Sequence, residues 1–126
     1  MSRHEVMDAS AVLALLQREP GAEHVNLRGA VMNSVNFAEV VQKTVARERP
    51  ADMLLRELTL LGLSITSFSP QEAQLAGELY RQTKTHGLSL ADRSCLSTAQ
   101  LLGAVAVTAD RHWSEVPHGV EVRSIR

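Results

Sequence analysis

The chain has 126 residues, enough for one globular domain with its own core, and its 44% hydrophobic and 21% charged residues are ordinary for such a domain. No apolar run reaches the length of a membrane span, and residues 1–5 lack the apolar stretch of a signal peptide. The formal net charge of −1 gives no overall basic character toward nucleic acid, and the 3% of aromatic residues argue against a base-stacking surface.

The single cysteine and the five histidines exclude further classes of site. Cys95 has no partner for an internal disulfide, which fits a protein of the reducing cytoplasm. The histidines show no paired spacing of the kind that zinc ligands have. We therefore expect a cytoplasmic protein without a zinc site, with Cys95 on the buried stripe of a helix.

The first half of the chain alternates short apolar segments with amphipathic ones. We predict a strand over residues 4–8, a helix over 9–19, a short helix within 21–28 and a strand over 30–33. Ser34 is the predicted cap of a helix reaching residue 48, and a further helix over 51–61 makes an apolar hairpin with it. Part of this hairpin faces either a partner subunit or the sheet, and the sheet is the commoner case.

The second half repeats the alternation. We predict a strand over residues 64–68, a helix over 69–85 with a capping box at its start, a helix ending at Gly103, a buried strand over 104–109 and an alternating edge strand over 120–125. Strands that alternate with helices predict a central, mainly parallel sheet with helices on its faces.

Three acids lie at the ends of these predicted elements. Asp8 and Asp110 each follow a strand, and Asp92 lies in the first turn of the helix before the buried strand. Ligands of open α/β sheets gather beyond the carboxyl ends of the strands, so these acids suggest a metal site. Each acid also has a purely structural alternative. Asp8 would cap a helix, in competition with Ser10, Asp92 would complete a capping box with Ser89, and Asp110 would open a polar turn.

A fourth acid, Glu39, is assigned to solvent by periodicity alone. The apolar stripe of its helix is Phe37, Val40, Val41, Thr44 and Val45. At about 100° per residue, Glu39 lies about 160–180° from the centre of that stripe. Helical-wheel arithmetic therefore predicts a solvated surface residue.

Four short segments, spread over nearly the whole chain, each contain one of these acids. They are Val6-Met-Asp8-Ala-Ser10-Ala, Asn33-Ser-Val-Asn-Phe-Ala-Glu39-Val, Leu88-Ser-Leu-Ala-Asp92-Arg and Val107-Thr-Ala-Asp110-Arg-His-Trp113. In this order and at these spacings they resemble the four motifs of PIN-domain nucleases, most closely the VapC-type toxin ribonucleases of bacterial toxin–antitoxin pairs. The resemblance implies a single three-layer α/β/α PIN-like domain over residues 1–126.

The resemblance also implies an active site. Asp8, Glu39, Asp92 and Asp110 would form one acidic pocket that binds Mg²⁺ or Mn²⁺ and cleaves RNA, which places Glu39 in the pocket against the helical-wheel prediction. Carboxylate oxygens are the hard ligands that Mg²⁺ prefers. Ser10 and Thr108 match polar positions that line such sites.

Two arginines are candidate contacts to the RNA. Leaving out the four pocket acids, ten Asp and Glu face thirteen Lys and Arg, a formal charge of +3. Arg93 and Arg111 directly follow two of the acids and could hold RNA phosphates. Solvated or ion-paired arginines are an equally good reading of both.

The resemblance further implies the partners. These are a cognate antitoxin, a second copy of the chain in a homodimer, and operator DNA only through the antitoxin, with no membrane. Two other functions stay open: another Mg²⁺-dependent phosphotransfer domain, or a PIN-fold binding module without catalysis. A phosphoacceptor domain needs a lysine near the strand ends, but Lys43 and Lys84 both lie in predicted helices.

Overall fold

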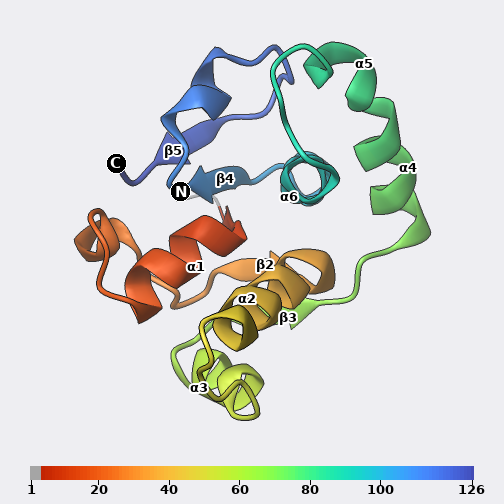
Figure 1. Ribbon diagram of the computed structural model, residues 1–126. Helices are drawn as coiled ribbons and strands as arrows, with labels where there is room; N and C mark the ends of the chain where they lie inside the picture. The colour runs from red at the N-terminus through yellow and green to blue at the C-terminus, as the bar shows by residue number, and fades with distance from the viewer. Residues whose placement is uncertain (1–3) are drawn as a thin grey trace.

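A five-stranded sheet forms the centre of the computed structural model, which describes residues 4–126 (Figure 1). Its strands are β1 (Glu5–Met7), β2 (Val31–Asn33), β3 (Ser64–Thr66), β4 (Val105–Thr108) and β5 (Val122–Ser124). Their order is β3-β2-β1-β4-β5, and every neighbouring pair is parallel. The predicted parallel sheet is confirmed. Residues 1–3, part of the segment in which we found no signal-peptide pattern, lie outside the described residues.

Helices cover both faces of this sheet. They are α1 (Ala9–Leu16), η1 (Ala22–His24), α2 (Ser34–Ala46), α3 (Leu54–Leu60), α4 (Pro70–Glu78), α5 (Tyr80–Thr83), α6 (Leu90–Leu102) and η2 (Arg111–Glu115). Helices α1, α2 and α3 pack on the face that bears Met7 and Met32, and α6 packs on the face that bears Val6 and Ala106. Figure 1 shows these two groups of helices on opposite sides of the strands, which confirms the three-layer α/β/α arrangement. Within residues 4–126, no helix is long and apolar enough to cross a membrane.

The α6–β4 unit follows the sequence closely. Ser89 caps α6 in a capping box with Asp92, and Gly103 ends the helix in the left-handed conformation with φ of 62°. In β4, Ala106 and Val107 point to opposite faces, and both are fully buried. A strand covered on both faces is what an apolar run without alternation predicts.

The start of α2 differs from the prediction. Its N-cap is Asn33 and not Ser34, because the Asn33 side-chain oxygen accepts the backbone N–H of Asn36 at 2.8 Å. The Ser34 hydroxyl instead accepts the backbone N–H of Phe68 at 3.1 Å. Asparagine and serine are comparable N-caps, so propensity could not separate two adjacent candidates.

Helix α1 ends at Leu16 rather than at residue 19, and two other predicted helices also differ. Helix α3 begins at Leu54, and residues 51–53 form a turn that the Leu54 N–H closes onto the Ala51 carbonyl. The helix predicted over 69–85 is two helices, α4 and α5, separated at Leu79. There the Leu79 carbonyl accepts from the backbone N–H of Gln82 and Thr83, and also from the Thr83 hydroxyl, which tightens the turn.

Candidate active site

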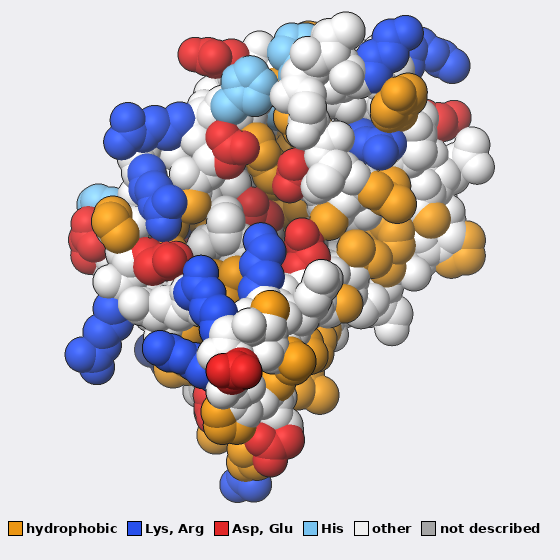
Figure 2. All heavy atoms as spheres, viewed as in Figure 1, with side chains coloured by type: hydrophobic (Ala, Val, Ile, Leu, Met, Phe, Trp, Pro, Cys, Tyr) orange, Lys and Arg blue, Asp and Glu red, His pale blue; other side chains and the backbone are white. Residues whose placement is uncertain are grey.

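Polar side chains meet where three neighbouring strands end. Asp8 follows β1, Asn33 ends β2 and Thr108 ends β4. Figure 2 shows Asp and Glu side chains gathered around a hollow near the centre of this face, with Lys and Arg side chains beside it. Because ligands of open α/β sheets bind beyond the carboxyl ends of the strands, this edge is the candidate site.

Asp8 is the most deeply buried of the four acids, with 5% of its surface exposed. Its Oδ1 atom accepts from the Ala11 backbone N–H at 2.9 Å and from the Ser10 hydroxyl at 2.7 Å, and its Oδ2 atom accepts from the Thr108 hydroxyl at 2.5 Å. Burial raises the pKa of Asp8 to about 6, these hydrogen bonds oppose the rise, and the charge of Asp92 adds to it. The site therefore contains a carboxyl group whose ionisation is costly without a nearby cation.

This raised pKa predicts how stability changes with pH. The pKa of Asp8 is about 6 in the folded chain against an ordinary 3.8, so folding favours the protonated acid. That stabilisation is present below the ordinary pKa and is lost as the pH rises through 6. In EDTA, the free energy of unfolding of the wild type should fall by roughly 2–3 kcal/mol more than that of Asp8→Asn between about pH 4 and about pH 7.

Urea unfolding at several pH values measures this difference. Asparagine keeps an oxygen for the N-cap but cannot ionise, so groups that titrate elsewhere contribute equally to both proteins. Parallel stability curves for the two proteins would contradict the raised pKa.

Glu39 lies on the side of α2 that faces the first turn of α6. Its Oε1 atom accepts from the Asn36 side-chain amide at 3.1 Å, and the same amide nitrogen donates to the Ala91 carbonyl at 3.0 Å. Glu39 is partly buried. The helical-wheel prediction of a solvated residue is therefore wrong, because it considered only the stripe of α2 itself and not the neighbouring α6.

Three acids act electrostatically on Cys95, which is fully buried in α6. Burial raises the pKa of the Cys95 thiol well above its ordinary value, and the charges of Asp8, Asp92 and Glu39 raise it further. The thiol therefore stays protonated and is no nucleophile. These three acids come from the end of β1, from α6 and from α2.

Asp92 and Asp110 use their carboxylates as helix caps. Asp92 Oδ2 accepts from the Ser89 backbone N–H at 2.9 Å, and Asp110 Oδ1 accepts from the His112 backbone N–H at 2.9 Å. The capping alternatives proposed for these acids are therefore present in the structure. Asp110 is exposed at the rim.

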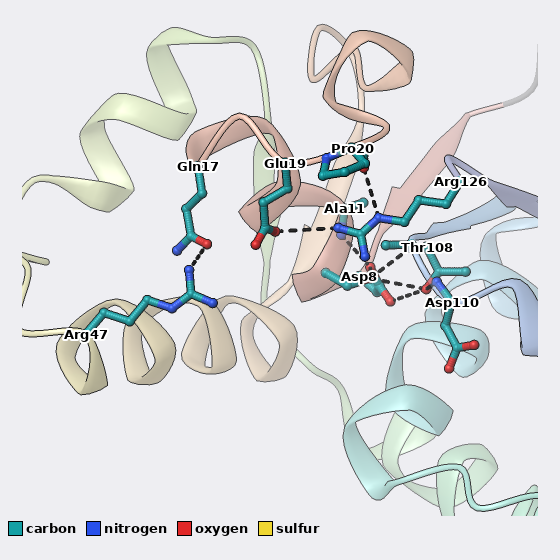
Figure 3. A network of polar contacts seen from close by, with 11 residues as sticks. Asp8, Ala11, Gln17, Glu19, Pro20, Arg47, Thr108, Asp110 and Arg126 are labelled. Carbon is teal, nitrogen blue, oxygen red and sulfur yellow. Dashed lines mark hydrogen bonds and ion pairs between the residues drawn. The ribbon is translucent and has the colours of Figure 1, made fainter.

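Thr108 connects the rim to the buried acid. Its hydroxyl donates to Asp8 and accepts the backbone N–H of Asp110 at 3.1 Å, as Figure 3 shows. The structure thus brings Asp92 within electrostatic reach of Asp8 and links the backbone of Asp110 to Asp8 through Thr108, while Glu39 lies at the contact between α2 and α6. Within residues 4–126, no three His, Cys, Asp and Glu side chains are arranged as a metal site.

The donors present nevertheless suit a hydrated divalent cation. They are carboxylate oxygens, and one of them belongs to Asp8, whose pKa is raised by burial and by the charge of Asp92. Next to Glu39, the Asn36 Oδ1 atom is buried and has no hydrogen-bond partner among the described residues. Mg²⁺ binds a few carboxylates and keeps several of its waters. The ion would supply a balancing charge, and one of its waters would donate a hydrogen bond to Asn36 Oδ1.

Two asparagines that support Glu39 were not among the predicted site residues. Asn33 and Asn36 are both fully buried. The Asn33 side-chain amide donates to the Thr98 hydroxyl at 2.8 Å and to the Ser94 carbonyl at 3.1 Å, which ties the start of α2 to α6. The Asn-x-x-Asn spacing at a helix start was the available signal, because it is typical of an N-cap.

Removing Asn33 should be costly. Asn33→Ala loses the cap and leaves buried partners unsatisfied, so the free energy of unfolding should fall by roughly 2–4 kcal/mol. Asn26→Ala is the matched control, because the Asn26 oxygen accepts only a local, exposed N–H from Arg28. Urea unfolding should show a loss below about 1 kcal/mol for that control. Equal losses for the two variants would contradict the supporting role of Asn33.

The two predicted RNA-contacting arginines lie in different surroundings. The Arg93 guanidinium donates to the Ala76 carbonyl at 3.0 Å and lies 5.1 Å from the centroid of the Tyr80 ring. These contacts attach Arg93 to α4 and α5. Arg111 is exposed, and among residues 4–126 it has no hydrogen bond or ion pair from its side chain.

Comparisons with known proteins agree with this architecture. The sequence matches the family described as PIN domain over residues 6–119. Similar solved structures include a toxin–antitoxin complex from Klebsiella pneumoniae, with a TM-score of 0.73, 17% identity and coverage of 97% of this chain and 98% of that chain.

Two VapBC structures are also similar. The DNA-bound VapBC from Salmonella typhimurium has a TM-score of 0.71, 17% identity and full coverage of both chains. VapBC-1 from nontypeable Haemophilus influenzae has a TM-score of 0.71, 18% identity and coverage of 96% and 97%. Comparison with curated proteins gave no match. At these identities, the structural likeness shows the fold.

Proposed function

Because the chain belongs to the PIN domain family, we propose that it is a metal-dependent endoribonuclease and the toxin of a type II toxin–antitoxin pair of the VapBC kind. The observation that carries the proposal is the buried Asp8 carboxyl at the carboxyl edge of a parallel sheet, with the charge of Asp92 near enough to act on it. All four motif acids fall inside the matched residues 6–119.

The acids Asp8, Glu39, Asp92 and Asp110 would hold Mg²⁺ or Mn²⁺. Such an ion, when bound, neutralises charge on the phosphate and activates water for hydrolysis. The existing hydrogen bonds do not prevent this role, because an ionised carboxylate has about four acceptor positions. Asp92 and Asp110 each accept one hydrogen bond and Asp8 accepts three, so each keeps at least one position.

Two hydroxyls hold the central acid in one orientation. Ser10 and Thr108 donate to different oxygens of the Asp8 carboxylate, so neither oxygen can rotate away from the hollow without losing a bond. Asn36 holds Glu39 in a similar way through its side-chain amide. Preorganised acceptors of this kind need not rearrange during the reaction, which favours catalysis.

An exposed apolar surface supports a protein partner. The α2–α3 hairpin exposes between 46% and 76% of the surface of five apolar residues, Val45, Met53, Leu55, Leu60 and Leu61. An amphipathic antitoxin segment could bury such side chains and place an Arg or Lys near the acids. We also propose a homodimer, with operator DNA bound only through the antitoxin.

The RNA-cleaving part of the proposal is tested with matched oligonucleotides. The purified chain should cleave a single-stranded RNA in Mg²⁺ and leave the DNA of the same sequence intact. Stable RNA binding without any cleavage would favour the binding module without catalysis. Phosphorylation of the protein by a small phosphodonor, with RNA left intact, would favour the phosphotransfer alternative.

The toxin part is tested separately in cells. Expression of the chain alone should arrest growth, and expression of the Asp92→Asn variant should be harmless. Co-expression with the adjacent small open reading frame should restore growth and yield a complex that copurifies. If the lone chain is harmless and no neighbouring product binds it, the toxin assignment fails, and the nuclease assignment is judged by the oligonucleotides.

A further inference from the structure

A pocket beside the acidic hollow contains two arginines from distant parts of the chain. It has a volume of about 510 Å³ and is lined by Ser10, Ala109, Asp110, Arg111 and Arg126. Arg111 follows β4 and Arg126 follows β5. Because β4 and β5 are parallel neighbours, both chain segments leave the sheet at the same edge, and the pocket forms between them.

The pocket is continuous with the proposed catalytic acids. Ser10, which lines it, donates its hydroxyl to Asp8 at 2.7 Å, and Asp110 lines it directly. Ser10 and Asp110 thus border both the pocket and the acids, so the pocket is a direct extension of the proposed site.

Two contacts orient the Arg126 side chain and leave some of its hydrogen-bond donors unused. Its Nε atom donates to the Pro20 carbonyl at 2.9 Å, and one guanidinium nitrogen lies 3.6 Å from a Glu19 carboxylate oxygen, as Figure 3 shows. A guanidinium has five N–H donors, so several stay available. Both side chains of this pair are about one-third exposed, at 36% and 34%, so solvent partly screens the pair.

We propose that Arg111 and Arg126 form a phosphate subsite that holds the RNA backbone next to the cleaved bond. This inference rests on the proposed ribonuclease function. Guanidinium groups match the geometry of phosphate oxygens better than ammonium groups do. Two carboxylates face these positive charges: Asp110, which lines the pocket and which the proposed cation would neutralise, and Glu19, which lies 3.6 Å from Arg126 at its edge. Contacts to phosphate position a strand without reading its bases, so the subsite adds affinity and not sequence preference.

RNA binding at several salt concentrations tests the subsite. The full chain carrying Asp92→Asn should bind a labelled single-stranded RNA in Mg²⁺ while cleaving it too slowly to affect the measurement. Adding Arg126→Gln or Arg111→Gln should raise Kd about 3- to 10-fold and reduce the slope of log Kd against log salt by up to about 0.7. Arg126→Lys should recover part of the affinity, because it restores the charge but not the planar fork.

The control removes the same charge elsewhere. Arg56, exposed on α3, lies outside the pocket, so Arg56→Gln should leave Kd within about twofold. In the cleaving wild-type background, the two pocket variants should raise KM with little change in kcat, because they remove binding common to the ground state and the transition state.

The outcomes separate the two proposals. If the pocket variants bind and cleave RNA as Arg56→Gln does, the subsite is wrong although the nuclease stands. If the folded wild type neither binds nor cleaves RNA, the proposed function itself is wrong.

Discussion

Asp92→Asn is expected to lower the kcat for RNA cleavage by about 10²-fold or more while leaving the fold intact. The asparagine keeps an oxygen that can accept the Ser89 N–H, so the capping box of α6 survives. It removes the negative charge that would help to hold the cation. Losses of about 10²–10³-fold are typical when a single electrostatic group of an active site is removed. Cleavage of one labelled RNA under single-turnover conditions measures the change.

The matched control is an acid outside the hollow. Asp52 is exposed in the turn before α3, and Asp52→Asn should cleave at the wild-type rate. Asp8→Asn, Glu39→Gln and Asp110→Asn should each behave like Asp92→Asn. A correctly folded Asp92→Asn protein that cleaves as fast as the wild type would show that the acids are caps and nothing more.

Mg²⁺ is expected to stabilise the wild type against unfolding. Two like charges about 4 Å apart repel by ~4 kcal/mol at an effective dielectric constant of about 20, before solvent and protonation relieve them. A bound cation removes this repulsion, and at about 100 times its Kd it adds about 2.7 kcal/mol, or roughly 10 °C in Tm for a chain of this size. Thermal melting in EDTA and in increasing Mg²⁺ or Mn²⁺ measures the gain.

The same experiment contains its own control. Asp8→Asn should gain much less from Mg²⁺, because a central ligand is lost, and in EDTA it should be no less stable than the wild type. Asp52→Asn should gain as much as the wild type. A wild-type melting curve that is indifferent to millimolar concentrations of both ions would count against the metal site.

Local sequence signals predicted most of the fold. The capping box at Ser89, the stop at Gly103 and the apolar run of β4 all act within a few residues, and all appear in the structure. Parallel order followed from the alternation of strands and helices. These features depend on backbone hydrogen bonds and burial, which leave a periodic trace in the sequence.

The site was only partly predictable because its geometry depends on neighbours far apart in the chain. The position of Glu39 depends on α6 lying beside α2, which no helical wheel contains. Arg126 reaches the pocket because β5 pairs with β4, and its isolated position in the sequence carried no signal of that pairing. For Asp8, Asp92 and Asp110, the capping and metal-binding interpretations both fit the same residues, so spacing alone could not choose between them.

The most direct test of a metal-dependent ribonuclease is to incubate the purified chain with total RNA and map the ends that appear. We predict new RNA ends in Mg²⁺ or Mn²⁺, none in EDTA, and their return when Mg²⁺ is added in excess over EDTA. Intact RNA in both ions, or the same ends in EDTA, would contradict the account.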